Sequence, residues 1–108
     1  MPAILAATVV SCTVARPVVK IAIVAPFSGI YGEIGYQVLN GARIAVKEHN
    51  DNNSNLPQLE LIAFDDLGDP SRAVEQAHKI LADKKVIAVI GHWLDQTTTV
   101  AAPIYMNA

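Results

Sequence analysis

The chain has 108 residues, of which 52% are hydrophobic and 17% are charged, and its formal net charge is −2 at pH 7. This length is sufficient for one domain with its own core, and the apolar fraction excludes an intrinsically disordered chain. The Lys and Arg residues are scattered along the sequence, which argues against a nucleic-acid-binding surface. We therefore expect one folded domain and no nucleic-acid partner.

Residues 1–17 differ in character from the rest of the chain. The stretch MPAILAATVVSC is apolar and uncharged, is too short to span a bilayer, and is typical of the hydrophobic region of a secretory signal. Residues 9–12, VVSC, resemble a bacterial lipobox, in which the cysteine is lipidated after cleavage. We predict an export leader over residues 1–17, with Cys12 as the lipidation site. The alternative is an N-terminal strand with a buried Cys12, because no Lys or Arg precedes the apolar run.

The first strand–helix unit is predicted over residues 18–49. Residues 18–25 are almost continuously apolar and β-branched, as expected for a strand covered on both faces. A glycine-containing loop follows, and from about Tyr36 the apolar spacing becomes helical. The predicted buried stripe of this helix consists of Val38, Ala42, Ala45, Val46 and His49.

Two further units follow the polar turn at residues 50–57. Residues 59–64 and 86–90 are predicted strands, the latter covered on both faces, and Asp69-Pro70 is a typical start for the helix between them. A third helix is predicted over residues 97–106. Regular strand–helix alternation indicates parallel strands with right-handed crossovers. We expect the strand order 2-1-3, helices on both faces, and continuation of the sheet in a longer protein.

The candidate site residues follow the first and third strands. Ligands of parallel α/β sheets bind outside the carboxyl ends of the strands, beside helix N-termini. We therefore predict a ligand-binding site formed by Ser28, Tyr31, His92, Trp93, Leu94, Asp95 and Thr97. A structural role remains the alternative for His92, and core packing beneath the loop remains the alternative for Trp93.

Several other chemistries are not supported by the motifs. The glycines at 29, 32 and 35 do not match the dinucleotide fingerprint, and no phosphate-loop G-K-[ST] follows them. Asp65, Asp66 and Asp69 spell D-D-x-x-D, but they follow a strand, so the carboxylates would not share one helical face. Loop and cap bonding explains them better than a metal does. Because no nucleophile–base pair is evident, we predict no catalytic residues, no metal and no cofactor.

Three segments carry a family resemblance: IAIVAPFSGIYGEIGYQVLNGARIAVKEHN, FDDLGDPSRAVEQAHKIL and VIAVIGHWLDQTTTVAAPIY. In order and spacing they resemble the first part of type I periplasmic binding proteins, within the Leu/Ile/Val-binding group that feeds ABC importers. The resemblance covers residues 18–108. It implies an α/β fold with a three-layer, Rossmann-like parallel sheet, forming part of the N-terminal lobe of a two-lobed protein that closes on a small ligand.

The resemblance also implies a function. We expect an extracytoplasmic protein, periplasmic or extracellular and lipid-anchored through Cys12, that delivers an amino acid or a related small polar solute to an ABC permease. The alternative is a ligand-sensing receptor or regulator domain of the same fold. Self-association of the isolated chain is expected through an exposed apolar sheet edge.

One departure from the family pattern concerns the ligand. In the family, a small hydroxyl residue at the start of the third helix contacts the ligand's carboxylate, and here Asp95 occupies that position. We expect Asp95 to favour a neutral or cationic ligand group, because two carboxylates repel each other. The alternative is that Asp95 caps the helix and points away. Ile34 stands where one branch of the family has an aromatic contact, and Tyr31 is the expected substitute.

Overall fold

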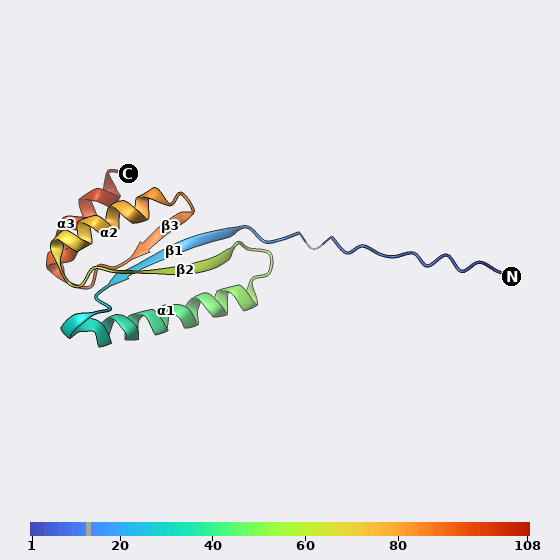
Figure 1. Ribbon diagram of the computed structural model, residues 1–108, viewed down its shortest axis with the longest axis horizontal. Helices are drawn as coiled ribbons and strands as arrows, with labels where there is room; N and C mark the ends of the chain where they lie inside the picture. Colours follow the sequence, from blue (N-terminus) through green and yellow to red (C-terminus); the bar gives the residue numbers. More distant parts are fainter. Residues whose placement is uncertain (13) are drawn as a thin grey trace.

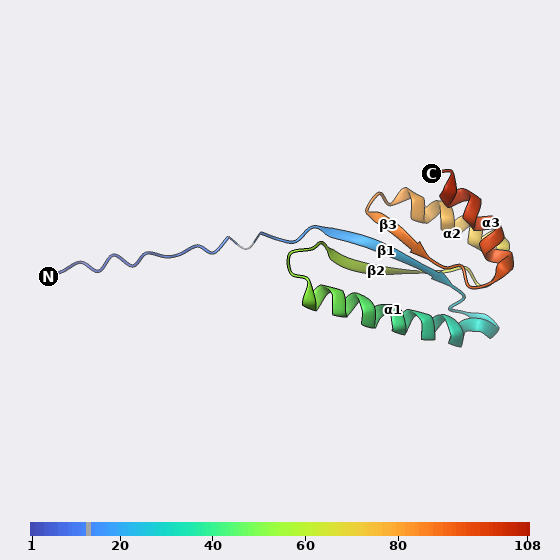
Figure 2. The same cartoon turned by 180° about the vertical axis from the view of Figure 1, so that it is seen from behind.

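The computed structural model describes residues 1–12 and 14–108. Within them, β1 (Val18–Ala25), the 3-10 helix η1 (Gly29–Tyr31), α1 (Gly32–Asn52), β2 (Gln58–Asp65), α2 (Pro70–Ala82), β3 (Val86–Ile90) and α3 (Asp95–Met106) follow in chain order. The strands are parallel and ordered β2-β1-β3, as the sequence predicts. Helix α1 lies on one face of the sheet, and α2 and α3 lie on the other (Figures 1 and 2). The predicted α/β class is therefore confirmed.

The core is centred on β1, the middle strand of the sheet. Its side chains alternate between the two faces, as in any strand. Ala22 and Val24 pack against Ile80 of α2, and Ile23, which is fully buried, is directed to the opposite face. The interface between α2 and α3 is made by the alanines Ala73, Ala77 and Ala101, whose small side chains allow the two helices to lie close together.

The start and buried face of α1 differ from the prediction. The helix begins at Gly32 and not near Tyr36, because Gly32 and Gly35 are buried against the backbone of the preceding loop and continue the helix. Ala45 is exposed, although the predicted stripe includes it. The buried face of α1 centres on Gly35 and Leu39, and Ala45 falls at its margin.

Two corrections concern the last unit of the chain. Helix α3 begins at Asp95, two residues earlier than predicted. Strand β3 is not covered on both faces, since Ile87, Ala88 and Ile90 are exposed. β3 is an edge strand, and α1 packs along β2 at the other side of the sheet.

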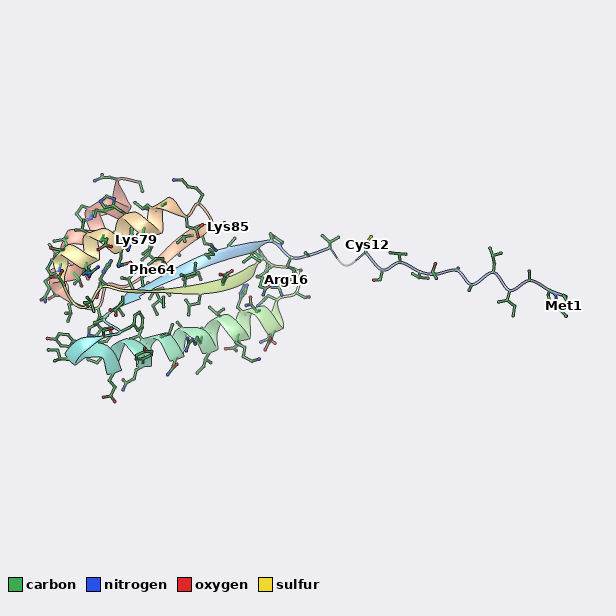
Figure 3. The ribbon with its side chains drawn as sticks, viewed as in Figure 1. Met1, Cys12, Arg16, Phe64, Lys79 and Lys85 are labelled. Carbon is green, nitrogen blue, oxygen red and sulfur yellow. The ribbon has the colours of Figure 1, made fainter. Side chains whose placement is uncertain are left out.

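The N-terminal segment lies apart from the fold (Figure 3). Residues 1–12 contain no helix or strand and Cys12 is exposed, so the alternative of a strand with a buried cysteine is wrong. The export leader stays a prediction, and Thr13 within it lies outside the described residues. Arg16 is tied to the fold: it donates hydrogen bonds to the carbonyl oxygens of Asn50, Asn53 and Leu56 at 3.0, 2.8 and 2.9 Å. Among the described residues, none of the helices has the length and apolar character needed to cross a membrane.

Candidate functional site

Three loops meet at the carboxyl edge of the sheet, at the end opposite the N-terminal segment (Figure 1). They comprise residues 26–31, 66–69 and 91–94. Gly68 lies between the other two loops: a methyl group placed on it would be 3.0 Å from Leu94 Cδ1 and 3.5 Å from Tyr31 Cδ2. The structure thus brings the predicted site residues Tyr31 and Leu94 to one place.

Asp65, the last residue of β2, fixes the first loop. Its Oδ1 accepts hydrogen bonds from the backbone N–H groups of Phe27 and Leu67, both at 2.9 Å, and its Oδ2 accepts one from Ser28 Oγ at 2.6 Å. Burial raises the pKa of Asp65, but the hydrogen bonds from Ser28 and the backbone outweigh burial and hold this pKa below its ordinary value. The Ser28 hydroxyl is therefore engaged with the protein, although Ser28 itself is exposed.

Asp66, the next residue, fixes the third loop. Its side chain is fully buried, its Oδ1 accepts from the N–H of Gly68 at 2.9 Å, and its Oδ2 lies 2.8 Å from His92 Nδ1. The other ring nitrogen, Nε2, lies 3.1 Å from the hydroxyl of Tyr105. His92 is only 8% exposed, which matches the structural alternative considered for it. Sequence reasoning missed the role of Tyr105, since nothing in its spacing links it to His92.

The start of α3 is built on close backbone contacts. Gly91 passes over β1 so closely that a methyl group on it would lie 2.2 Å from Val24 O, which only glycine allows. Thr97 is fully buried and donates its hydroxyl to Leu94 O at 2.9 Å. Asp95, in contrast, is exposed in the first turn of α3. The helix has Leu94 as N-cap and no side-chain cap bond, so the alternative in which Asp95 caps the helix is not what the structure shows.

Two hollows lie near these loops. One of about 290 Å³ adjoins the ends of β1 and β3 and includes the predicted residues His92 and Trp93 in its lining. A larger one of about 450 Å³ runs along the free edge of β3, beneath α2 and α3. The first has the location expected of a ligand site in a parallel sheet, and the second has the location expected of a further sheet contact.

Besides Ser28, whose hydroxyl is bonded to Asp65, and the half-buried Leu94, the predicted site residues fall into two groups. Tyr31, Trp93 and Asp95 are exposed at the strand ends, and Trp93 keeps 51% of its surface accessible. His92 and Thr97 are buried with their polar atoms bonded inside the protein. Of the predicted residues, two aromatic side chains and one carboxylate are therefore exposed at this edge of the sheet. The N-cap role predicted for Asp69 is confirmed by its bond from Arg72 N at 3.0 Å.

Comparison with known proteins identifies the family. Residues 18–108 match the family described as periplasmic binding protein. The chain belongs to the periplasmic binding protein family. It is 38% identical over 88 residues to the leucine-specific-binding protein of Salmonella typhimurium, covering 81% of this chain and 24% of that protein. It is 34% identical over 96 residues to the leucine-, isoleucine-, valine-, threonine-, and alanine-binding protein of Pseudomonas aeruginosa, covering 88% and 26%.

A solved structure agrees with this membership. The structure of a possible leucine/isoleucine/valine-binding protein from Rhodopirellula baltica matches with a TM-score of 0.78 and 28% identity, covering 85% of this chain and 25% of that one. The chain thus has the fold of type I periplasmic binding proteins, in the branched-chain amino-acid group, and corresponds to part of the N-terminal lobe. It spans about a quarter of the length of the relatives it matches.

Proposed function

We propose that this chain forms the first part of the ligand-binding lobe of a protein that delivers an amino acid or a related small polar solute to an ABC permease. The observation that carries the proposal is the meeting of three strand-end loops around Gly68, in a chain that belongs to a family of binding proteins. The names of the relatives, which describe leucine and branched-chain amino-acid binding, support this solute class. The protein binds and releases its solute without a catalytic step.

Within the site, we propose that Tyr31, Trp93 and Asp95 face the ligand, since they are exposed at the strand ends. Leu94 lines the floor of the site beside Gly68. Ser28, His92 and Thr97 hold the loops in place and do not contact the ligand, because their polar atoms are bonded to the protein.

Asp95 distinguishes the ligand of this protein from a simple branched-chain amino acid. Two carboxylates about 4 Å apart repel by about 1 kcal/mol in water and about 4 kcal/mol at intermediate dielectric. The helix N-terminus offsets only about 0.3–1 kcal/mol for an exposed charge. A neutral or cationic ligand group is therefore favoured at this end of the site.

A chimera tests both parts of the proposal. Residues 18–108 replace the matching segment of the leucine-specific-binding protein of Salmonella typhimurium, and calorimetry measures the binding of L-leucine and of L-leucinamide, which lacks the carboxylate. Asp95→Ser should raise the affinity for leucine about tenfold. This change corresponds to the removal of about 1.4 kcal/mol of net repulsion between the two carboxylates, which lies within the range given above. Asp69→Ser is the matched control, because it removes one negative charge from the neighbouring helix start and retains a capping residue.

The outcomes separate the two parts. A folded chimera that binds neither compound, with Asp95 or with Ser, would refute the solute-binding role. Tight leucine binding by the unmodified chimera, unchanged in Asp95→Ser, would refute only the role of Asp95.

The proposed cellular location is extracytoplasmic, with a lipid anchor on Cys12. The exposed position of Cys12 on the N-terminal segment is compatible with modification (Figure 3). Expression in a bacterial host with a labelled fatty acid should label the wild-type chain and not Cys12→Ser. Equal labelling of both would exclude this site.

We also propose that the isolated chain self-associates through the free edge of β3. Ile87 and Ile90 are exposed there, at 65% and 45%, and the strand contains neither charge nor proline to block pairing.

A further inference from the structure

A buried chain of polar contacts links the end of β2 to the last turns of α3. It runs from Asp66 through His92 to Tyr105, with contacts of 2.8 and 3.1 Å. Asp66 is 0% exposed and His92 is 8% exposed. The second carboxylate oxygen of Asp66 accepts a hydrogen bond from Gly68 N–H. Burying such groups is costly, and removing one partner leaves the other unsatisfied, so the chain specifies one arrangement of these elements.

The two adjacent acids at the end of β2, Asp65 and Asp66, hold different loops in place. Asp65 bonds to the loop after β1, and Asp66 bonds to the loop after β3. Successive side chains of an extended segment point to opposite faces of the sheet, so the two neighbouring carboxylates reach different loops, although β1 and β3 both lie on the same side of β2. This places all three strand-end loops under the control of one dipeptide.

The position of His92 is transmitted to the start of α3 through the backbone. Thr98 Oγ1 lies 2.8 Å from His92 O and 2.9 Å from Leu94 O, so its single hydroxyl proton is shared between these two carbonyls. The loop between these two carbonyls contains Trp93, and the helix begins directly afterwards at Asp95. A shift of the His92 ring would therefore move the exposed residues Trp93 and Asp95.

We propose that Asp66, His92 and Tyr105 are positioning residues that hold the loop before α3, and so orient Trp93 and Asp95 at the ligand site. That these two residues face a ligand rests on the proposed function. The positioning itself is a property of this chain and does not depend on any ligand.

The contacts define a direction for the hydrogen bonds. With Asp66 ionised, His92 donates its Nδ1–H to the carboxylate and its Nε2 accepts the hydroxyl proton of Tyr105. Burial and then the charge of Asp66 raise the pKa of Tyr105 to about 12, so the phenol keeps the proton that this bond requires. Each of the three groups thus fixes the orientation of the next.

The test uses Trp93, the single tryptophan of the sequence, together with amide hydrogen exchange in the unliganded chain. Thr98 N–H donates to Leu94 O at 2.9 Å and reports on the first turn of α3. Tyr105→Phe should speed exchange at Thr98 about two- to tenfold, as for the loss of one net hydrogen bond, and should increase quenching of Trp93 by acrylamide. The control is Leu39→Val, which weakens the core beside α1. The exchange rates of Tyr105→Phe and Leu39→Val are compared at urea concentrations that give the two variants the same free energy of unfolding.

Further variants separate positioning from general destabilisation. Tyr36→Phe removes an exposed hydroxyl and should leave both readouts unchanged. Asp66→Ala should have the largest effect on Thr98 and Trp93, and Asp66→Asn, which keeps an acceptor oxygen, should recover most of it.

Equal effects of Tyr105→Phe and Leu39→Val on both readouts would overturn the proposal, as would equal effects of Asn and Ala at Asp66. If Asp66→Ala does not fold, the Tyr105 and Leu39 pair decides. Because no ligand enters the experiment, its failure would leave the proposed function intact, and a failed leucine titration would leave the positioning role intact.

Discussion

Gly35 offers the sharpest test of how α1 and the first loop fit together. A methyl group on Gly35 would lie 2.1 Å from Pro26 O and 2.9 Å from Pro26 C, far inside normal contact distances. Both atoms belong to the backbone that follows β1, so they yield only if the whole loop moves. Gly35→Ala is therefore expected to separate α1 from the loop that contains the candidate site residues Ser28 and Tyr31.

The magnitude follows from two opposing effects. Overpacking of a tight contact costs about 1–3 kcal/mol, and the severity of this contact places Gly35→Ala at the upper end. The replacement of glycine by alanine inside a helix returns about 1 kcal/mol. We expect a net loss of about 2 kcal/mol, a large fraction of the stability of a domain this small.

Gly41→Ala provides a matched control in the same helix. Apart from its chain neighbours and the adjoining helix backbone, no atom lies within 4 Å of the position that its methyl group would occupy, and the residue is exposed. Only the helix propensity acts there, so this variant should be stabilised by about 0.5–1 kcal/mol. Urea denaturation followed by circular dichroism measures both changes. If Gly35→Ala is as stable as Gly41→Ala, the close contact between α1 and the loop is not present in solution and the reasoning fails.

Three further predictions concern charge and association. The Tyr105 phenol should titrate at about pH 12 in ultraviolet absorbance, a step missing in Tyr105→Phe. Stability should fall between about pH 10 and 12, because the unfolded chain loses this proton first, and Tyr105→Phe should lose less. The pKa of Asp65 is lower in the folded chain than in the unfolded chain, where it is about 3.9, so Asp65 stabilises the fold above this pH. This stabilisation is lost as the pH falls through the folded pKa. Ser28→Ala should weaken this dependence on acid pH in denaturation curves. In sedimentation, Ile87→Lys should suppress self-association and Ile44→Lys, on exposed α1 surface, should not; suppression by both would mean that the β3 edge is not the contact.

The sheet could be predicted from the sequence because its determinants are local. The apolar run at residues 18–25 and the Asp69-Pro70 helix start mark element boundaries directly, and the structure reproduces both. The start of α1 could not be predicted, because Gly32 and Gly35 are typical of a loop until a close tertiary contact explains them. The exposure of Ile87 could not be predicted from the sequence either, since an apolar strand has the same sequence pattern whether one of its faces or both are covered.

The proposed location of the candidate site follows from a general rule, whereas the contacts of each residue could not be predicted. The rule that ligands bind at the carboxyl ends of parallel strands points to the loops after β1 and β3 without any knowledge of contacts. It does not separate Trp93, which is exposed, from His92, which is buried beside it. That distinction depends on Asp66 and Tyr105, which lie 26 and 13 residues from His92 in the chain.

The adjacent acids of β2 show why chemistry-bearing motifs at a strand end need a structural interpretation. In sequence, Asp65 and Asp66 suggest a shared role, such as binding one metal ion. In the fold the two acids have different partners, because Asp65 bonds to the first loop and Asp66 bonds to His92 in the third. A surface made of three loops needs bonds between the loops, and the buried bond between Asp66 and His92 is costly to lose because water is excluded there. The two acids at the end of β2 make these bonds, and Tyr31, Trp93 and Asp95 are not among their hydrogen-bond partners, so a substitution at these exposed residues removes none of the bonds that join the loops.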